Sequence, residues 1–157
     1  MDISYLFYLS SGLFLGWSLG ANDASNIFGT AVGSKMVRFT TIALVSCFFV
    51  ILGAVYGGAG TSKTLGALGA VNALAGAFMV ALSAALAVYS MARTGLSVSS
   101  SQAVVGAIIG WNLYAGKPTD LETLARICST WTVCPLLSGL VAVVLYFIFK
   151  RILKYSH

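Results

Sequence analysis

The placement of charged residues constrains this chain more than any other feature of its sequence. Five stretches contain no charged side chain, namely residues 3–22, 39–62, 64–92, 94–116 and 127–149. A helix needs roughly 20 apolar residues to cross a bilayer, and each stretch reaches that length. Alternation over about ten residues, typical of a membrane β-barrel, is absent. We therefore predict an all-α integral membrane protein with about five transmembrane segments.

Composition supports this class and extends it over the whole chain. Hydrophobic residues make up 59% of the sequence and charged residues only 8%, which is too apolar for one small water-soluble domain. We expect residues 1–157 to form a single transmembrane domain. A net charge of +5 does not indicate a nucleic-acid partner, because the basic residues form no basic face.

The basic residues instead predict an orientation in the membrane. Six fall on one side of the five expected crossings and three on the other. The first side carries Lys35, Arg38, Arg93, Lys150, Arg151 and Lys154, and the second carries Lys63, Lys117 and Arg126. We expect a multi-pass protein of the cell membrane, with the N-terminus outside and the basic tail 150–157 in the cytoplasm.

Few residues are available for enzymatic chemistry. The only histidine is His157, at the end of the sequence, so a nucleophile–histidine arrangement is not supported. Cys47, Cys128 and Cys134 lack the spacing of a zinc site or a disulfide framework. We expect neither an enzyme nor an organic cofactor.

A polar cluster interrupts the first apolar stretch. Residues 20–26 read GANDASN, and apolar residues precede and follow them. Polar residues within about thirty apolar ones indicate a helix broken inside the membrane, where free backbone groups can bind a ligand. We expect such a broken helix over residues 3–34.

Asp23 is the only acidic residue inside an apolar stretch. A carboxylate in a bilayer costs at least ~2.5 kcal/mol on insertion scales, and no Lys or Arg of the same stretch offsets that cost. Its partner is then a bound cation, a proton or a basic group from another chain. Asn22 and Asn26 add neutral oxygens, and the three residues form a hard-oxygen set suited to Na⁺. The alternative is a protonated Asp23 that only hydrogen-bonds a neighbouring helix.

A second polar cluster opens the fourth stretch. We expect residues 94–113 to form a half-helix or re-entrant hairpin with serines at its tip. Ser99 and Gln102 fit a capping box at the start of a helix. The free N–H groups of that helix, with the hydroxyls of Ser100 and Ser101, predict an anion site. A capping role alone is the alternative interpretation.

Three further signals concern the ends and bends of helices. The second span is expected over residues 39–58, with a glycine-rich turn at 57–60. Thr119 or Asp120 can cap the helix that follows. Pro135 predicts a kink in the last span.

Three segments in order resemble the inorganic phosphate transporter (PiT) family. Residues 20–34, GANDASNIFGTAVGS, resemble the GAND signature of that family. Residues 98–110, VSSSQAVVGAIIG, and 131–139, WTVCPLLSG, are similar to its serine-rich hairpin and to its following helix. The resemblance implies cation-coupled transport of phosphate, with Na⁺ or H⁺ as coupling ion.

Carried over by position, the resemblance implies two groups of site residues. Asn22, Asp23 and Asn26 would hold the cation, and Asn22 and Asp23 would also contact phosphate. The phosphate cradle would consist of Ser99, Ser100, Ser101 and Gln102. One departure is Val50, which stands where some family members have a glutamate.

The number of repeats is a second departure from the family. Its members resemble two inverted repeats, each with a GAND motif, and this sequence has one. An odd number of spans suits one unit of an inverted pair. We expect an N-terminal-type half of a transporter that pairs with a distinct partner half or an antiparallel copy, as a dimer or a larger assembly. Transport of another oxyanion such as sulfate, or a non-transporting assembly or sensor subunit, are the competing functions.

Overall fold

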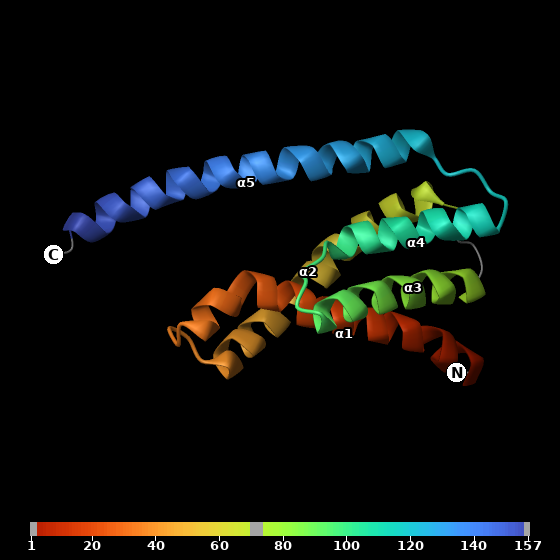
Figure 1. The fold of residues 1–157 in the computed structure, drawn as a ribbon, viewed down its shortest axis with the longest axis horizontal. Helices are drawn as coiled ribbons and strands as arrows, with labels where there is room; N and C mark the ends of the chain where they lie inside the picture. Colours follow the sequence, from red (N-terminus) through yellow and green to blue (C-terminus); the bar gives the residue numbers. More distant parts are fainter. Residues whose placement is uncertain (1–2, 70–73, 156–157) are drawn as a thin grey trace. The chain divides into compact units, whose positions relative to one another are not determined.

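In the part of the chain that the structure describes, the regular secondary structure is entirely α-helical. The computed structural model describes residues 3–69 and 74–155 (Figure 1). In chain order the helices are α1 (Ile3–Gly33), α2 (Phe39–Leu68), α3 (Leu74–Arg93), α4 (Ser100–Tyr114) and α5 (Leu121–Tyr155). The prediction of an all-α membrane protein is confirmed.

Three helices are long and apolar enough to cross a membrane within the described residues. They are α2, α3 and the part of α5 between Leu121 and Leu153. At 15 residues, α4 measures about 22 Å, whereas the hydrocarbon core is about 30 Å thick. The 31 residues of α1 are long enough, but the GANDASN segment makes the middle of that helix polar. The described residues thus contain five helices, of which three have the length and apolar character of a membrane span, while α4 is too short for a full crossing.

The chain divides into two compact units, Met1–Thr119 and Asp120–His157. The second consists of α5, a gently curved rod of 35 residues in Figure 1. This helix joins the short helix, the last span and most of the basic tail that we expected as separate pieces; residues 156–157 of that tail lie outside the described residues. Pro135 lies inside the helix, where its missing N–H removes one backbone hydrogen bond without ending the helix.

α1 does not break at the GANDASN segment, so the expected interruption is wrong. The helix continues from Ile3 to Gly33. Asn, Asp and Ser only moderately disfavour a helix, and the segment contains no proline, the one residue that would interrupt the helix strongly. The hydroxyl of Ser25 donates to the carbonyl of Asn22 within the same turn, at 2.8 Å. The polar groups of α1 act from an intact helix, through their side chains.

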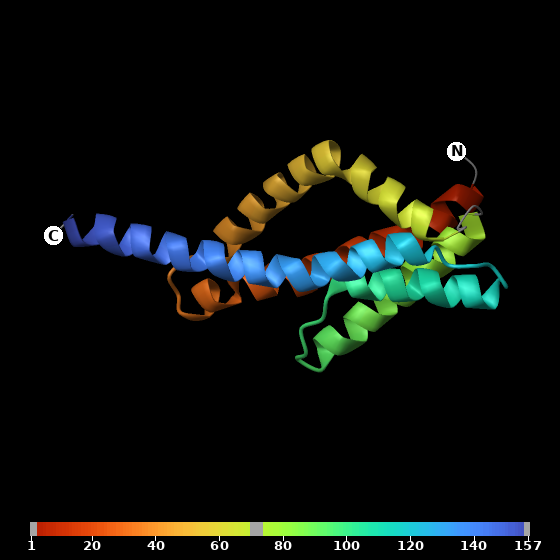
Figure 2. The same cartoon turned by 90° about the horizontal axis from the view of Figure 1, so that it is seen from above.

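The glycine-rich turn expected after the second span is also wrong. α2 continues through Gly57, Gly58 and Gly60 and ends at Leu68. Figure 2 shows this helix bent near its middle, in the part that contains several glycines. Glycine weakens a helix by about 1 kcal/mol relative to alanine and allows a kink, but it does not end a helix by itself. The hydroxyl of Thr64 donates to the carbonyl of Gly60 at 3.1 Å, as helical residues four apart do.

The packed core of the first unit consists of α1, α3 and α4. α3 packs against both other helices, as Figure 1 shows. Small residues of α3 permit this, since Ala84 and Ala85 are fully buried. A Cβ on Gly76 would lie 2.8 Å from the ring of Trp111, so α3 and α4 approach too closely there for a side chain.

Aromatic contacts establish that α1 and α3 run in the same direction. Near the start of both helices, Phe7 and Phe78 stack with their ring centroids 4.9 Å apart. Further along both, Trp17 lies 5.6 Å from Tyr89. α3 therefore ends beside the middle of α1, and α4 returns from that point.

A buried asparagine fixes the other end of α4. Asn112 is fully buried, and its amide donates to the carbonyl of Leu68 at 3.4 Å and to the hydroxyl of Thr119 at 3.0 Å. A Cβ on Gly69 would lie 2.6 Å from Ile108, so only glycine fits at this approach. These contacts tie the end of α2 to the end of α4 and hold the α3–α4 hairpin at its base.

Candidate functional site at the tip of the α3–α4 hairpin

The connection between α3 and α4 is a tight turn followed by an extended segment. Gly95 has φ of 78°, a left-handed conformation that glycine adopts without strain. The N–H groups of Thr94 and Leu96 donate to the carbonyl of Met91 at 3.0 and 3.1 Å and close the end of α3. Residues 96–99 then lead into α4. We call residues 94–101 the hairpin tip.

Ser99 caps α4, as the sequence predicts. Its backbone is extended, and its hydroxyl oxygen accepts from the N–H of Gln102 at 3.4 Å. The hydroxyls of Ser99 and Ser101 lie 3.1 Å apart and share a hydrogen bond. Two of the three serines are thus bonded to each other at the start of α4.

Asn22 attaches the hairpin tip to the middle of α1. Its side-chain amide donates to the carbonyl of Val98 at 2.8 Å, and its oxygen accepts from the N–H of Val98 at 3.3 Å. The side chain is 2% exposed. These two hydrogen bonds pair a side-chain amide with a backbone peptide group 76 residues away in the sequence. It satisfies two backbone groups that an apolar setting would otherwise leave unpaired.

Asp23 contacts Ser100, the middle one of the three consecutive serines. The hydroxyl of Ser100 donates to one carboxylate oxygen of Asp23 at 3.1 Å and lies 3.4 Å from the other. The amide of Asn22 donates to the same carboxylate at 2.8 Å. Asn22 is buried, and Asp23 and Ser100 are partly buried. The two groups that donate to the carboxylate, from Asn22 and Ser100, are neutral. In the described residues the single ion pair is between Arg126 and Glu122, so no basic side chain pairs with Asp23 there.

The structure therefore brings together part of the sequence-predicted set. Asn22, Asp23 and Ser100 form one hydrogen-bonded group, while Ser99 and Ser101 lie beside it on the tip. Gln102 joins this set through its backbone N–H. Asn26 lies one turn further along α1 and is exposed. Among the described residues, no group of three or more His, Cys, Asp or Glu gathers as a metal cluster would require.

A pocket of about 360 Å³ adjoins this group and includes residues that the sequence reasoning missed. It is lined by Trp17, Ala21, Asn22, Ser25 and Asn26 of α1 and by Tyr89, Ala92, Arg93, Gly95, Leu96 and Ser97 of α3 and the tip. Arg93 was assigned only to a loop between two spans. The signal that could have identified it is its position six residues before Ser99, which a re-entrant hairpin places at the tip.

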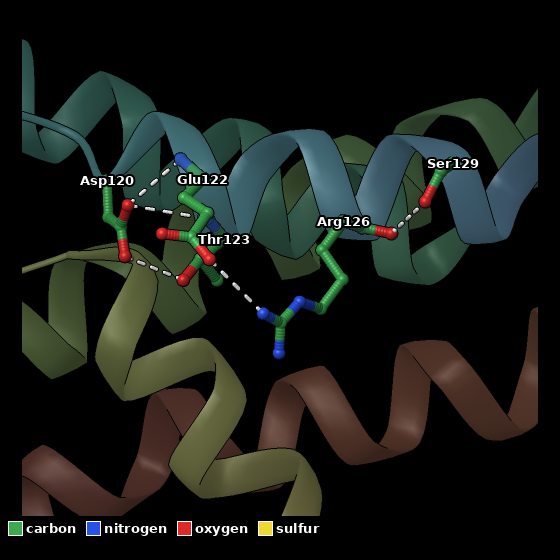
Figure 3. A network of polar contacts seen from close by, with 5 residues as sticks. All are labelled: Asp120, Glu122, Thr123, Arg126 and Ser129. Atoms are coloured by element: carbon green, nitrogen blue, oxygen red, sulfur yellow. Dashed lines mark hydrogen bonds and ion pairs between the residues drawn. The ribbon is translucent and has the colours of Figure 1, made fainter.

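A second polar network lies at the start of α5 and has a different character (Figure 3). One carboxylate oxygen of Asp120 accepts from the N–H groups of Glu122 at 3.0 Å and Thr123 at 3.3 Å, which confirms it as the cap of this helix. Its other oxygen accepts from the hydroxyl of Thr123 at 2.7 Å. The hydrogen bonds from Thr123 contribute most to lowering the pKa of Asp120 below its ordinary value. The hydrogen bond from Glu122 and the charge of Arg126 lower this pKa further, and burial opposes them.

Val50 stands at the position where the resemblance leads one to expect a glutamate. Val50 lies on α2 and is 68% exposed in this chain. Its neighbours Phe49 and Ile51 are exposed to a similar degree, as expected for an apolar helix surface that faces lipid or another protein surface. The residue at this place therefore does not join the group around Asp23.

These features define a class: a helical membrane protein in which a hairpin tip meets a carboxylate in the middle of an apolar helix. Comparison with known proteins narrows that class. The chain belongs to the phosphate transporter family, whose model matches residues 19–157.

Curated relatives agree with this assignment. The chain is 28% identical over 152 residues to inorganic phosphate transporter 2-1, chloroplastic, of Arabidopsis thaliana, covering 89% of this chain and 26% of that protein. It is 32% identical over 149 residues to sodium-dependent phosphate transporter 1 of Mus musculus, covering 83% and 21%. It is 30% identical over 166 residues to a sodium-dependent phosphate transporter of Plasmodium falciparum, covering 92% and 24%.

Length separates the chain from these relatives. It spans between 21% and 46% of the length of the curated relatives it matches. No solved structure matches it.

Proposed function

We propose that this chain supplies one half of a secondary transporter that carries inorganic phosphate across the cell membrane together with Na⁺ or H⁺. Membership of the phosphate transporter family supports the substrate, and the sodium-dependent relatives support the cation. Because the chain spans less than half of each of these relatives, the proposal includes a second half. A distinct partner chain fits better than an antiparallel copy, since the basic residues favour one orientation.

The observation that carries the proposal is the contact between Asp23 and Ser100. It joins the one acidic residue in the middle of α1 to the serine-rich start of α4, 77 residues away in sequence. A cation bound at the Asp23 carboxylate would lie next to hydroxyls that can donate to an anion. Side-chain oxygens of Asn22 and Asn26 complete a set of hard donors suited to Na⁺.

The same contact suggests how the two ions are coupled. The Ser100 hydroxyl donates its hydrogen to Asp23. When Na⁺ or a proton takes up the charge of Asp23, that acceptor weakens and the hydroxyl becomes free to donate to a phosphate oxygen. The cation therefore supplies both a neighbouring positive charge and a released donor. Phosphate binding favours cation binding by the same factor, because coupling between two sites is reciprocal.

The rest of the phosphate cradle comes from the start of α4. Unpaired N–H groups of the first helical turn favour an anion at that end. Ser99 and Ser101 now share one hydrogen bond and Ser99 caps Gln102, so both hydroxyls have a local partner that phosphate would replace. Together with Ser100, they form a set of short donors that suits a tetrahedral oxyanion.

We propose that α3 and α4 re-enter the membrane and do not cross it separately. Their tip contacts α1 at Asn22, eleven residues before that helix ends at Gly33, which corresponds to about 16 Å along the axis. Removing two crossings leaves the orientation unchanged, with the N-terminus outside and the tail in the cytoplasm. Arg93 then leaves the count of cytoplasmic charges, and five basic residues oppose three.

The test replaces two aspartates in the native host, so that any partner half stays present. Asp23→Asn should abolish uptake of radiolabelled phosphate that depends on Na⁺ or pH, while the amount of protein in the membrane stays the same. Asp120→Asn makes the same chemical change at the cap of α5, where Asn also caps well, and should leave uptake near normal. Undiminished uptake by the Asp23→Asn protein would refute the role of this carboxylate.

Two further measurements separate the competing functions. If unlabelled sulfate suppresses phosphate uptake as strongly as phosphate does, the transported substrate is a broader class of oxyanion. If calorimetry in detergent finds no phosphate binding even with the partner half present, the chain is a non-transporting subunit. Phosphate binding that strengthens with Na⁺ or at lower pH supports the coupled transporter.

A further inference from the structure

The pocket beside Asn22 contains a positive charge that the proposed phosphate site does not use. Arg93 lines the pocket together with Asn22, Asn26 and Ser97. Asp23 and the serines at 99–101 do not line it, so the pocket is a neighbouring space that shares Asn22 with the carboxylate group. Its contents therefore require a separate explanation.

Two features hold Arg93 at this position. It is the last residue of α3, where the partial negative charge of the helix end favours a cation. Its guanidinium carbon also lies 5.7 Å from the ring centroid of Tyr89, a cation–π distance. Trp17 packs against the same ring, and Phe14 stacks on Trp17 with centroids 6.0 Å apart. An aromatic group on α1 and α3 thus supports the guanidinium.

Arg93 is exposed and forms no ion pair among the described residues. The ion pair between Arg126 and Glu122 is the single one among residues 3–69 and 74–155, so Arg93 has no carboxylate partner there. A guanidinium carries five N–H donors in a planar fork that matches two oxygens of a phosphate or carboxylate. The neutral amide of Asn26 and the hydroxyl of Ser97 line the same space, whereas both N–H groups of Asn22 already donate to Asp23 and Val98. The pocket presents one cation and several hydrogen-bonding groups, the complement of a small oxyanion.

We infer that this pocket is an access site in which Arg93 receives the phosphate anion before it reaches the serines of the hairpin tip. The inference rests on the proposed function and adds to it a residue and a step. Arg93 recognises negative charge through its paired N–H groups, and Asn22 borders both the pocket and the Asp23 carboxylate. The anion therefore moves from a site with a fixed positive charge to one whose positive charge arrives as the coupling ion.

The first test uses the unmodified full chain and needs no variant. Phenylglyoxal reacts with accessible arginines, and mass spectrometry can follow each of the four arginines of the chain separately. Inorganic phosphate at about ten times its dissociation constant for the Arg93 pocket should occupy most of these pockets. The labelling of Arg93 should then slow about tenfold. Arg38, Arg126 and Arg151 serve as internal controls and should react at the same rate with and without phosphate.

The second test changes the charge and the shape of the side chain separately. Arg93→Gln should weaken binding of inorganic phosphate by about ten- to a hundredfold, the range expected for one charge-assisted hydrogen-bonding group. Arg93→Lys keeps the charge but loses the planar fork, and should weaken binding less. Arg126→Gln removes an arginine outside the pocket and should bind phosphate as the unmodified protein does.

The outcomes distinguish this inference from the proposed function. If the unmodified protein binds phosphate and Asp23→Asn impairs transport, but Arg93 is neither protected nor required, the access site is refuted and the transporter stands. If the unmodified protein binds no phosphate with the partner half present, the proposed function fails and this inference fails with it. Selective protection of Arg93, together with weaker binding by Arg93→Gln, supports both.

Discussion

Two aspartates of this chain accept hydrogen bonds from hydroxyl groups, and the comparison between them separates a functional arrangement from a structural one. Asp120 accepts from Thr123 at 2.7 Å, three residues away in an exposed helix start, and Arg126 adds a positive charge nearby. Asp23 accepts from Ser100 at 3.1 Å, 77 residues away, in a partly buried setting. Hydroxyl contact alone therefore does not identify a site.

The difference lies in what balances each negative charge. At Asp120, local backbone N–H groups, a hydroxyl and an arginine complete the surroundings of the carboxylate. At Asp23, the hydrogen bonds come from two neutral donors, Asn22 and Ser100. Among residues 3–69 and 74–155 no basic side chain pairs with Asp23, and a carboxylate in an apolar helix without such a partner is expected to serve an ion or a proton. The variants below test that distinction, beginning with the largest expected effect.

Replacing Asn22 with Ala should have the largest effect on stability. The variant leaves the N–H and carbonyl of Val98 without their partner and removes one donor to Asp23. Each unpaired buried group costs ~1–3 kcal/mol, so the free energy of unfolding in detergent should fall by about 2 kcal/mol or more. Asn26→Ala is the matched control, because Asn26 is exposed, and should change that free energy by less than about 0.5 kcal/mol. Equal losses in the two variants would show that Asn22 does not hold the tip.

The serines of the hairpin tip should rank next and should not be equivalent. Ser100→Ala removes the hydroxyl that contacts Asp23, so phosphate affinity should fall about tenfold or more and should depend less on Na⁺ or on pH. Ser101→Ala removes a hydroxyl whose partner is Ser99, and should have a smaller effect on the cation dependence. Phosphate titrations at low and high Na⁺, and at two pH values, measure both. A larger loss of coupling in the Ser101→Ala protein would contradict the proposed role of Ser100.

Sequence patterns correctly predicted the local features of this fold. Ser99, and either Thr119 or Asp120, are predicted as helix caps because short polar side chains before a helix satisfy its free N–H groups. Ser99 and Asp120 form those bonds. Asn22, Asp23 and the serine segment were singled out because polar groups are rare in apolar stretches. Such local signals need only a few neighbouring residues.

Long-range features were not visible in the sequence. α1 stays intact at GANDASN because its polar side chains find partners on the hairpin tip, and a pattern cannot show those partners. α2 continues through its glycines because a helix in an apolar setting retains its backbone hydrogen bonds despite a weak local helix propensity. Arg93 was counted as a loop charge because its proximity to Asn22 depends on α3 running parallel to α1. The errors at α1 and Arg93 arose where tertiary contact decided the outcome, and the error at α2 arose from the apolar environment of the helix.

The cap of α5 should make the stability of the protein depend on pH. Hydrogen bonds hold the pKa of Asp120 below its ordinary value, so the charged form stabilises the folded helix start above that ordinary value. The stabilisation is lost as the pH falls through the lowered pKa. Asp120→Asn keeps a capping side chain that does not titrate, so its unfolding temperature relative to the unmodified protein should rise as the pH is lowered from 5 to 3. An unchanged difference over that range would rule out a titrating cap.

The smallest effect is expected for the ion pair between Glu122 and Arg126. Its atoms lie 3.3 Å apart and the side chains are 86% and 76% exposed, so Glu122→Gln should lower the free energy of unfolding by only ~0.3–0.5 kcal/mol. Arg126→Gln removes the same pair without changing the acidic first turn and is the matched control. About 1 M salt should erase the difference between variant and unmodified protein, because the Debye length then falls to about 3 Å.

The identity of that salt completes the comparison between the two aspartates. Screening at α5 depends on ionic strength, so NaCl and choline chloride should act alike on the Glu122→Gln difference. A binding site at Asp23 must instead distinguish the cations, because choline is too large for a set of carboxylate and amide oxygens. Sodium-specific stabilisation that disappears in Asp23→Asn would identify Na⁺ as the coupling ion. Stabilisation at lower pH, equal in both salts and absent from that variant, would identify the proton.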